Sequence, residues 1–302
     1  MSTATLLFLA MILDAITGEP KWLWDKVPHP AVLMGRAVKY CDERFNTGHQ
    51  KRRNGVLVLV GLVLAAGIAG YLISLFGGIV TIIVAAILLA QKSLAQHVGN
   101  VGRGLRMSLA EGRRQVAMIV GRDTRDMDQS AVARGAIESA AENLSDGVIA
   151  PAFWFLIGGL PGLLIYKIVN TADSMIGYRT EQHEEFGWAA ARFDDLLNLI
   201  PARLTAVLIA LPAGVIGRMK PIQQDAKRHR SPNAGWPESA MARALNIALA
   251  GPRSYDGALQ DFPWVNTNGD RHPNATTIDA ACAMLWKAWA VLLMVVFVIA
   301  LF

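Results

Sequence analysis

Dense groups of polar residues lie directly beside long apolar runs in this chain, and this arrangement limits the fold more than any other feature. One group occupies residues 122–147 and the other residues 167–198. Carboxylates are costly near a bilayer and are rarely kept there without a function. Their density therefore predicts a chemical site, of a kind that suits a polyanionic or highly oxygenated substrate.

The composition favours a membrane protein. Hydrophobic residues make up 53% of the 302 residues and charged residues only 18%, whereas soluble domains have roughly 25% charged residues. The mean hydropathy is +0.33. The formal charge of +5 includes basic clusters at 51–53, 113–114 and 227–230, which flank apolar runs as cytoplasmic anchors do. We therefore expect the lipid bilayer as a partner and no nucleic acid. Cys41 and Cys282 lie far apart and define neither a disulfide framework nor a zinc site.

A helical hairpin and a C-terminal helix are predicted to span the membrane. Residues 55–75 and 77–89 are apolar and separated by a short turn, which predicts a transmembrane helical hairpin over 55–94, with the second arm extended to cross about 30 Å. The polar ends of the hairpin carry Lys and Arg, which predicts that these ends lie in the cytoplasm and that the protein is in the cytoplasmic (inner) membrane. Residues 281–302 form the other span. Residues 6–13 are apolar but short, so they predict a weak span or a membrane-embedded helix, retained at the N-terminus rather than removed as a signal peptide.

Residues 151–218 leave two topologies open. The apolar run 151–169 carries a Gly-Pro cluster at its middle, and the run 204–216 contains Pro212 and Gly214. If both runs span, residues 170–200 lie outside the cell. If both are re-entrant, all polar groups share the cytoplasmic face. We favour the shared face, because a Gly-Pro cluster at mid-run is typical of a hairpin tip packed in protein.

The sequence predicts polar helices and loops in the segments between these apolar runs. Residues 103–150 predict a soluble helical segment, and residues 219–280 predict a polar loop and helix segment in which Pro237 and Glu238 open a helix. The strand signal is negligible. The predicted class is all-α, with residues 1–302 forming a single membrane-embedded domain of polytopic type.

In the first polar group, Glu138, Glu142 and Ser145 are spaced by four and three residues, which stacks them on one helix face. Two carboxylates and a hydroxyl there could hold magnesium. The alternative is a solvated helix face with an ion pair from Arg134. Residues 143–147 predict the end of the helix, where Asp146 could cap the apolar segment that comes next. Capping would not account for Asn143 and Ser145.

The segment before this helix contains Arg122, Asp123 and Arg125. The two arginines are candidate forks for phosphate or carboxylate. The alternative is a loop followed by a helix N-cap, with Asp126 or Asp128 as the capping residue.

The second polar group has a helical stripe of polar side chains, which inverts the usual amphipathic pattern. A stripe of this kind must face a polar cavity or another polar element, unless it is the exposed face of an interfacial helix. A pair of acids comes next, one turn before an asparagine. The residues concerned are Lys167, Asn170, Thr171, Asp173, Ser174 and Tyr178 in the stripe, then Asp194, Asp195, Asn198 and Arg203.

His29 lies between two prolines and ahead of Arg36. A histidine in this setting is more often a rigid turn residue than a ligand. The chain contains neither of the glycine-rich phosphate loops, GxxxxGK[ST] and GxGxxG, and no HExxH motif.

Taken in order along nearly the whole chain, these segments resemble the cobalamin-biosynthesis amide synthases, the membrane-bound adenosylcobinamide-phosphate (cobinamide) synthase family. One departure is Glu19, where aspartate is expected more often. The matching segments are Leu13-Asp14 to Gly18-Glu19-Pro20, Pro28-His29-Pro30 with Gly35-Arg36, Arg122-Asp123-Thr124, Glu138 with Glu142 to Gly147, Lys167 with Asn170 to Met175 and Gly177-Tyr178, Phe193-Asp194-Asp195 with Asn198, Pro201-Ala202-Arg203, and Ser231 to Gly235 with Pro237-Glu238.

The resemblance implies an ATP-dependent ligase that joins aminopropanol, or its O-phosphate, to the free propionate of adenosylcobyric acid. The implied partners are the corrinoid substrate, the small amine and other membrane-associated cobalamin-synthesis enzymes. The implied catalytic and magnesium-binding residues, with base and metal roles unresolved, are Glu138, Glu142, Asp146 and Asp173, and Glu138, Glu142 and Asp173 are the magnesium candidates. The implied substrate and phosphate contacts are His29, Arg36, Arg122, Asp123, Arg125, Asn143, Ser145, Lys167, Asn170, Ser174, Asp194, Asp195, Asn198, Arg203 and Asn233.

Two other interpretations compete. One is a magnesium-dependent membrane prenyl- or alcohol-phosphate transferase, because paired acids such as Asp194 and Asp195 occur in diphosphate-binding motifs. No second acid-rich motif of that kind is present at a comparable position. The other is a non-enzymatic membrane sensor or scaffold on the same fold, against which the intact polar groups argue.

Overall fold

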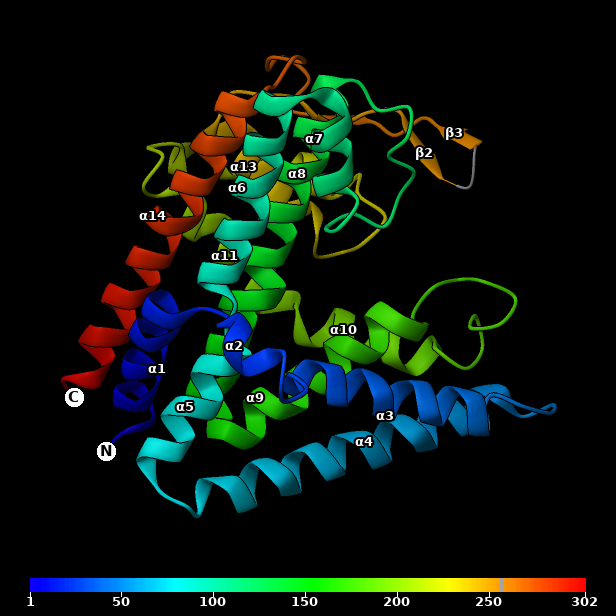
Figure 1. The fold of residues 1–302 in the computed structure, drawn as a ribbon, viewed down its shortest axis with the longest axis vertical. Helices are drawn as coiled ribbons and strands as arrows, with labels where there is room; N and C mark the ends of the chain where they lie inside the picture. Colours follow the sequence, from blue (N-terminus) through cyan, green and yellow to red (C-terminus); the bar gives the residue numbers. More distant parts are fainter. Residues whose placement is uncertain (256–257) are drawn as a thin grey trace. The chain divides into compact units, whose positions relative to one another are not determined.

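The protein is almost entirely helical in a computed structural model that describes residues 1–255 and 258–302 (Figure 1). The chain divides into two compact units, each built from segments distant in sequence. The first comprises Met1–Ala90, Ala150–Leu199 and Val296–Phe302, and the second comprises Gln91–Ile149 and Ile200–Val295. The predicted all-α class is confirmed, and the single-domain organisation stays a prediction.

Several helical stretches are long and apolar enough to cross a membrane, which confirms a polytopic membrane protein. They are Lys51–Ser74, Gly78–Met107, Gln129–Ile176 and Ala275–Ala300. The apolar helices Thr3–Thr17 and Leu199–Ala210 are shorter, below the roughly 20 residues that a spanning helix needs. The topology of residues 151–218 stays a prediction.

The first unit packs its long helices around α9. Gly70 of α4 approaches α9 so closely that a Cβ there would lie 2.6 Å from the Cα of Pro161. This contact requires glycine, because any side chain would separate the two helices. The helices of this unit are α1 (Thr3–Thr17), α2 (Lys21–Trp24), α3 (Pro30–Phe45), α4 (Lys51–Ser74), α5 (Gly78–Leu88), α9 (Ala150–Ile176) and α10 (Trp188–Leu197).

The predicted hairpin has its two helices and its turn at the expected positions, but the helices do not pair along their length. Helix α4 packs mainly on α9, and α5 packs mainly on α1. Figure 1 shows α4 and α5 diverging from the turn. Each arm therefore packs one side on a different helix, which the hydropathy of the two arms could not indicate. Most of α4 remains exposed, with 11% of its apolar stretch buried.

Helix α9 breaks where the Gly-Pro cluster predicted a hairpin tip. Gly159 has φ 59° and ψ −149°, a conformation that glycine adopts without steric cost. A Cβ on Gly162 would lie 2.4 Å from the carbonyl oxygen of Trp154. Residues eight apart in a straight helix are separated by about 12 Å along the axis, so the chain folds back at Gly159.

The second unit contains all or nearly all of each remaining helix; only Leu199 of the helix Leu199–Ala210 and residues 296–300 of the helix Ala275–Ala300 fall in the first unit. Its α8 does not end at residues 143–147 as predicted, because the chain continues through a π-helical turn, η1 (Ser145–Ile149), directly into α9. The other elements are α6 (Gln91–Met107), α7 (Leu109–Val116), α8 (Gln129–Leu144), α11 (Leu199–Ala210), the 3-10 turn η2 (Ile216–Arg218), α12 (Met219–Ala226), α13 (Gly235–Ala244) and α14 (Ala275–Ala300).

A small β segment in the second unit was not predicted. Strand β1 (Leu249–Ala250) pairs antiparallel with β4 (Trp264–Val265), with Leu249 opposite Val265. Strand β2 (Arg253–Tyr255) pairs antiparallel with β3 (Ala258–Gln260). Strands of two or three residues are too short to give an alternating hydrophobic pattern, which is why the sequence did not indicate them.

Candidate functional site in the second unit

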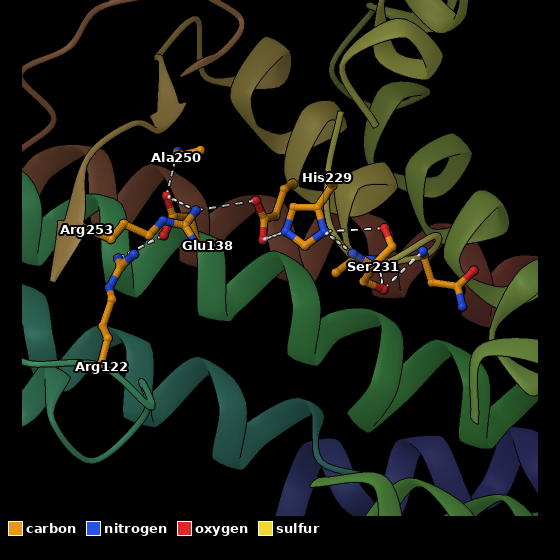
Figure 2. Close-up of polar contacts among 9 residues, drawn as sticks. Arg122, Glu138, His229, Ser231, Ala250 and Arg253 are labelled. Atoms are coloured by element: carbon orange, nitrogen blue, oxygen red, sulfur yellow. Dashed lines mark hydrogen bonds and ion pairs between the residues drawn. The ribbon is translucent and has the colours of Figure 1, made fainter. Parts of the chain in front are cut away.

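Glu138 is the centre of a buried ionic cluster (Figure 2). Its Oε2 accepts a hydrogen bond of 2.8 Å from Nη2 of Arg122. Its Oε1 accepts a hydrogen bond of 2.7 Å from the backbone N–H of Ala250 and lies 3.1 Å from Nη2 of Arg253. Glu138 is 5% exposed. The solvated-face alternative is therefore excluded for this residue, and its partners are not the predicted Arg134, which donates to the carbonyl oxygen of Arg271.

A second buried carboxylate lies beside this cluster. Glu238, in the first turn of α13, is 2% exposed. Its Oε2 lies 3.9 Å from Nη2 of Arg253, and its Oε1 lies 3.6 Å from Nε2 of His229. Burial raises the pKa of Glu238 well above its ordinary value, and the charge of Glu138 raises it further. The neutral acid is therefore favoured at this position.

His229 lies between its own loop and Glu238. Its Nδ1 is 3.1 Å from the backbone nitrogen of Ser231 and 3.4 Å from the Ser231 carbonyl oxygen, and its Nε2 faces Glu238 at 3.6 Å. Figure 2 shows the imidazole of His229 beside Ser231. Burial lowers the pKa of His229, so the ring and the acid beside it are both favoured in their uncharged forms.

Arg253 and the Ala250 N–H reach this cluster from the β segment, at a turn with positive φ angles. Ala250 and Gly251 have φ values of 60° and 73°, and a non-glycine residue at positive φ is uncommon. A Cβ on Gly251 would lie 2.5 Å from the ring of Trp264. The turn therefore needs glycine at 251, and its backbone is fixed where the Ala250 N–H meets Glu138.

Two cavities adjoin the cluster. The first, which we call the Arg134 cavity, has a volume of about 250 Å³. The second, which we call the Phe262 cavity, has a volume of about 220 Å³. Ala250 and Arg253 line both. The charged residues of the Arg134 cavity are Arg122, Asp123, Asp126, Asp128, Arg134 and Arg253. The Phe262 cavity is lined by Glu142, Asp225, Arg228, His229, Arg230, Glu238, Arg253 and the rings of Phe262 and Trp264, among others.

The structure thus brings some predicted residues together and leaves others apart. Arg122 and Asp123 line the Arg134 cavity, and Glu142 lines the Phe262 cavity, whereas Arg125 lines neither. Asp128 is the N-cap of α8, accepting from Ala131 N–H at 2.7 Å. The capping alternative is therefore confirmed for Asp128, which also lines a cavity.

The polar residues at the end of α8 have different environments. Asn143 is exposed and donates to the carbonyl oxygen of Ser139 at 2.9 Å. Ser145 is 2% exposed, and its Oγ has no hydrogen-bond partner among the described residues. Asp146 lies within the π-helical turn rather than at a helix end. Such turns are frequent at functional sites, and the roles predicted for these residues stay predictions.

Arg203 and Asn233 meet although 30 positions separate them. Arg203 donates to Oδ1 of Asn233 at 3.3 Å and lies over the ring of Trp236 at 4.8 Å. Asn233 is buried, and its backbone N–H donates to the Oγ of Ser231. The contact joins two predicted substrate residues beside the segment that carries His229.

Glu238, His229 and Arg253 were missed as site residues. Glu238 stands in a segment that contributes to the family resemblance, so that segment contained a signal for it. His229 and Arg253 follow no local pattern, because their relation to Glu138 arises only when α8, α13 and the β segment pack together.

The second polar group and the first unit

The second polar group forms a hydrogen-bond chain in the first unit. Asp194 accepts from Nδ2 of Asn170 at 3.2 Å and from Nδ2 of Asn198 at 3.0 Å. The Tyr166 hydroxyl donates to Oδ1 of Asn198 at 3.1 Å. Burial raises the pKa of Asp194 to about 6. These hydrogen bonds join α9 to the C-terminal end of α10. The polar stripe thus faces another polar element, as expected for polar side chains on an apolar helix.

The other residues of this group lie around the C-terminal end of α9. Ser174 is exposed, and Lys167 is half-buried. The side chain of Asp173 lies over Gly177, where a Cβ would be 2.0 Å from Oδ1 of Asp173. Asp195 is half-buried, and burial raises its pKa. The two polar groups fall in different units, so their meeting in one site stays a prediction.

His29 has the contacts of a turn residue. It is the N-cap of α3, where its Nδ1 accepts from the Ala31 N–H at 3.1 Å. Its Nε2 therefore carries the proton and donates to the carbonyl oxygen of Ile87 at 3.2 Å. Arg36 is exposed on the same helix. The turn interpretation of His29 is supported, and the substrate contacts predicted for both residues stay predictions.

Fit of a metal ion and relation to known proteins

The donor set fits a magnesium ion bound together with phosphate, and not a resident ion held by protein alone. Within residues 1–255 and 258–302, no three His, Cys, Asp or Glu side chains form a group that could hold a metal ion. Of the predicted ligands, Glu142 lines a cavity, Glu138 is bound by Arg122 and Ala250, and Asp173 belongs to the other unit. Magnesium usually takes one or two carboxylates, with phosphate oxygens and water completing its shell.

The fold and site define a polytopic helical membrane protein with a buried ionic cluster between two small cavities. The family described as "CobD/Cbib protein" matches residues 7–285. The chain therefore belongs to the CobD/Cbib family, and a role in cobalamin biosynthesis follows from that membership.

Individual relatives agree with the family match. "Cobalamin biosynthesis protein CobD" of Brucella anthropi is 46% identical over 306 residues, with 95% of this chain and 94% of the relative covered. The protein of the same name from Rhizobium meliloti is 46% identical, with 95% and 94% covered. That of Rhodobacter capsulatus is 40% identical, with 99% and 98% covered. No solved structure matches the chain.

Proposed function

We propose that this chain is an ATP-dependent ligase of the cytoplasmic membrane, which joins aminopropanol or aminopropanol O-phosphate to the free propionate of adenosylcobyric acid. The observation that carries the proposal is the ionic cluster of Glu138, Arg122 and Arg253 between the two cavities. This cluster holds guanidinium groups in cavity walls that also contain carboxylates, which is the donor set that activation of an acid by a nucleotide needs. The membership in a cobalamin-biosynthesis family supplies the substrate class.

The proposed reaction proceeds in two balanced steps. A propionate oxygen of the corrinoid attacks the terminal phosphorus of ATP, the bond to ADP breaks, and an acyl phosphate forms. The amine, after giving one proton to a base, then attacks the acyl carbon. The carbon–oxygen bond to phosphate breaks, the amide remains, and phosphate leaves with the second proton from nitrogen. A base is required because aliphatic amines are largely protonated at neutral pH.

The residues of this chain supply binding, charge and proton transfer in that scheme. Arg122 offers a guanidinium whose Nε is buried and has no hydrogen-bond partner among the described residues, and it is a phosphate-binding candidate. Magnesium, when bound with the nucleotide, would offset the negative charge of the phosphates, and the carboxylates that line the Arg134 cavity with the arginines would hold it there. Glu142 lines the other cavity and is assigned the role of base. Asp173, Lys167 and Asn170 are assigned to the corrinoid or the amine.

The proposal places the site on the cytoplasmic face, because ATP is available there. It also fits association with other membrane-bound enzymes of cobalamin synthesis, which would pass on a large corrinoid. The prenyl-transferase alternative receives no support from Asp194, since both its oxygens accept hydrogen bonds from asparagine amides.

The test is an assay of membranes that contain the protein, with adenosylcobyric acid, ATP and each amine in turn, read by mass. Glu142→Ala and Asp173→Ala should abolish amide formation while the protein remains in the membrane. Glu184→Ala, at an exposed position, is the control and should keep wild-type turnover. Wild-type turnover in either of the first two variants would refute its assigned role, and pyrophosphate release from a prenyl donor would favour the transferase.

A further inference from the structure

The two cavities share one wall. Arg253 and Ala250 line both of them. Ligand pockets for molecules of nucleotide size usually occupy about 300–1,000 Å³. The two cavities, at about 250 Å³ and 220 Å³, are each smaller than that. Their combined volume lies within the range. A ligand of nucleotide size bound at this cluster would therefore extend past Arg253 into both cavities.

The Arg134 cavity has the chemistry of a phosphate site. Three guanidinium groups line it, those of Arg122, Arg134 and Arg253. Arg122 is 7% exposed in its side chain, and its Nε has no hydrogen-bond partner among the described residues. Guanidinium groups bind phosphate oxygens with paired, charge-assisted hydrogen bonds. The lining of this cavity therefore includes a buried guanidinium donor whose hydrogen bond is unmade among the described residues.

The carboxylates in the same cavity do not exclude a phosphate chain. Asp123, Asp126 and Asp128 line it together with the three arginines, so its ionised side chains carry as many negative as positive charges. A triphosphate that brings a divalent cation presents both signs to such a lining, since the cation takes carboxylate and phosphate oxygens together.

The Phe262 cavity has the chemistry of a site for a planar base. The guanidinium carbon of Arg230 lies 4.3 Å from the centre of the Phe262 ring, and that of Arg253 lies 5.3 Å from it. Trp264 lines the same cavity. Nucleobases stack on aromatic rings and on guanidinium planes with little dependence on sequence. A planar base could extend this stack.

We propose that a nucleoside triphosphate binds across the two cavities, with its phosphates in the Arg134 cavity and its base against Phe262. Arg253, at the boundary, lies where the ribose and the first phosphate would pass. This inference rests on the proposed function for its use of ATP, and it assigns that ATP a place in a chain without a glycine-rich phosphate loop.

The experiment measures binding of ATP and of inorganic tripolyphosphate to the full-length protein in detergent. Phe262→Ala should weaken ATP binding about tenfold and leave tripolyphosphate binding unchanged, and Phe262→Tyr should restore ATP binding. Arg134→Gln should weaken both ligands by about tenfold. Arg271→Gln is the matched control, because Arg271 and Arg134 both lie over the Trp264 ring, at 4.9 Å and 5.2 Å, but Arg271 lines neither cavity. It should change neither affinity.

Photolabelling with an azido-purine analogue of ATP supplies a readout that needs no variant. Labelled peptides should come from residues 228–230 or 260–265. Labelling elsewhere, or equal effects of Phe262→Ala on both ligands, would overturn the inference. The nucleotide site and the proposed function can fail separately. A protein that binds ATP here and makes no amide would refute the ligase but not the nucleotide site.

Discussion

Arg122 and Glu138 form an ion pair of 2.8 Å in which the side chains are 7% and 6% exposed. Arg253 reaches the same carboxylate from β2, at 3.1 Å. Removing one partner from a buried ion pair leaves an uncompensated charge, which costs more than the pair itself contributes. The two guanidinium groups are therefore held beside the cavities by one carboxylate, and the site depends on its charge.

The first prediction follows from that dependence. Glu138→Gln keeps the shape of the side chain and removes its charge, so two buried guanidinium groups lose their common partner. We expect the free energy of unfolding to fall by about 3 kcal/mol, measured as a lower thermal midpoint in detergent. Asp279→Asn is the control, because its ion pair with Arg106 is about half exposed. It should change stability by less than about 1 kcal/mol, and equal losses in both variants would contradict a buried cluster.

The second prediction concerns the reversal of α9. Gly162→Ala should destabilise the protein by about 2 kcal/mol, because the added Cβ would lie 2.4 Å from the carbonyl oxygen of Trp154. Gly158→Ala, four residues earlier in the same helix, meets no atom within 4 Å and should leave the thermal midpoint unchanged or raise it. A straight α9 would tolerate both changes alike, so equal midpoints would argue against the fold-back at Gly159.

The Gly159 break could be predicted because its cause is local. A glycine-proline cluster within an apolar run can adopt backbone angles that other residues avoid, and the structure has φ 59° at that position. The spacing of Glu138 to Glu142 also predicted Glu138 as a site residue, and the structure places it in a buried ionic cluster. The partners of Glu138 were not predictable, since Arg253 lies more than a hundred positions away and only packing brings it to α8.

The continuation of α8 into η1 shows the opposite case. Residues 143–147 are polar turn formers, so local propensity predicted a helix end. Leu144, Ser145, Val148 and Ile149 are all buried, and a helical turn satisfies the backbone hydrogen bonds that an irregular loop would leave unpaired there. Tertiary burial thus outweighed local preference. The short strands and the position of His229 beside Glu238 depend in the same way on contacts that no sequence pattern records.

The third prediction is a pH dependence. Burial raises the pKa of Asp194 from 3.8 to about 6, so the folded protein holds this proton more tightly than the unfolded chain. The stabilisation from this group is fully present below its unfolded pKa and is lost as the pH rises through about 6. Asp194→Asn stays neutral throughout. The stability of the wild type relative to this variant should therefore fall by about 2 kcal/mol between about pH 4 and pH 8.

The difference between the two proteins isolates Asp194, because the other titrating groups are common to both. The variant also loses one acceptor for the amides of Asn170 and Asn198, which adds an offset that does not change with pH. Glu184→Gln, at an exposed position, should run parallel to the wild type. A constant difference between wild type and Asp194→Asn would show that the carboxyl group does not titrate in this range.

The last prediction decides whether the two polar groups can act together. If residues 170–200 share the cytoplasmic face with residues 103–150, then cysteines placed at Glu184 and Arg114 will both resist an impermeant maleimide in intact spheroplasts. Both will react once the membrane is opened. Both positions are exposed, and Cys41 and Cys282 are first replaced by serine to remove background. Reaction at residue 184 in intact cells would place Asp173 and Lys167 beside the outer face, where ATP is absent, and the second polar group could not then take part in the proposed ligase site.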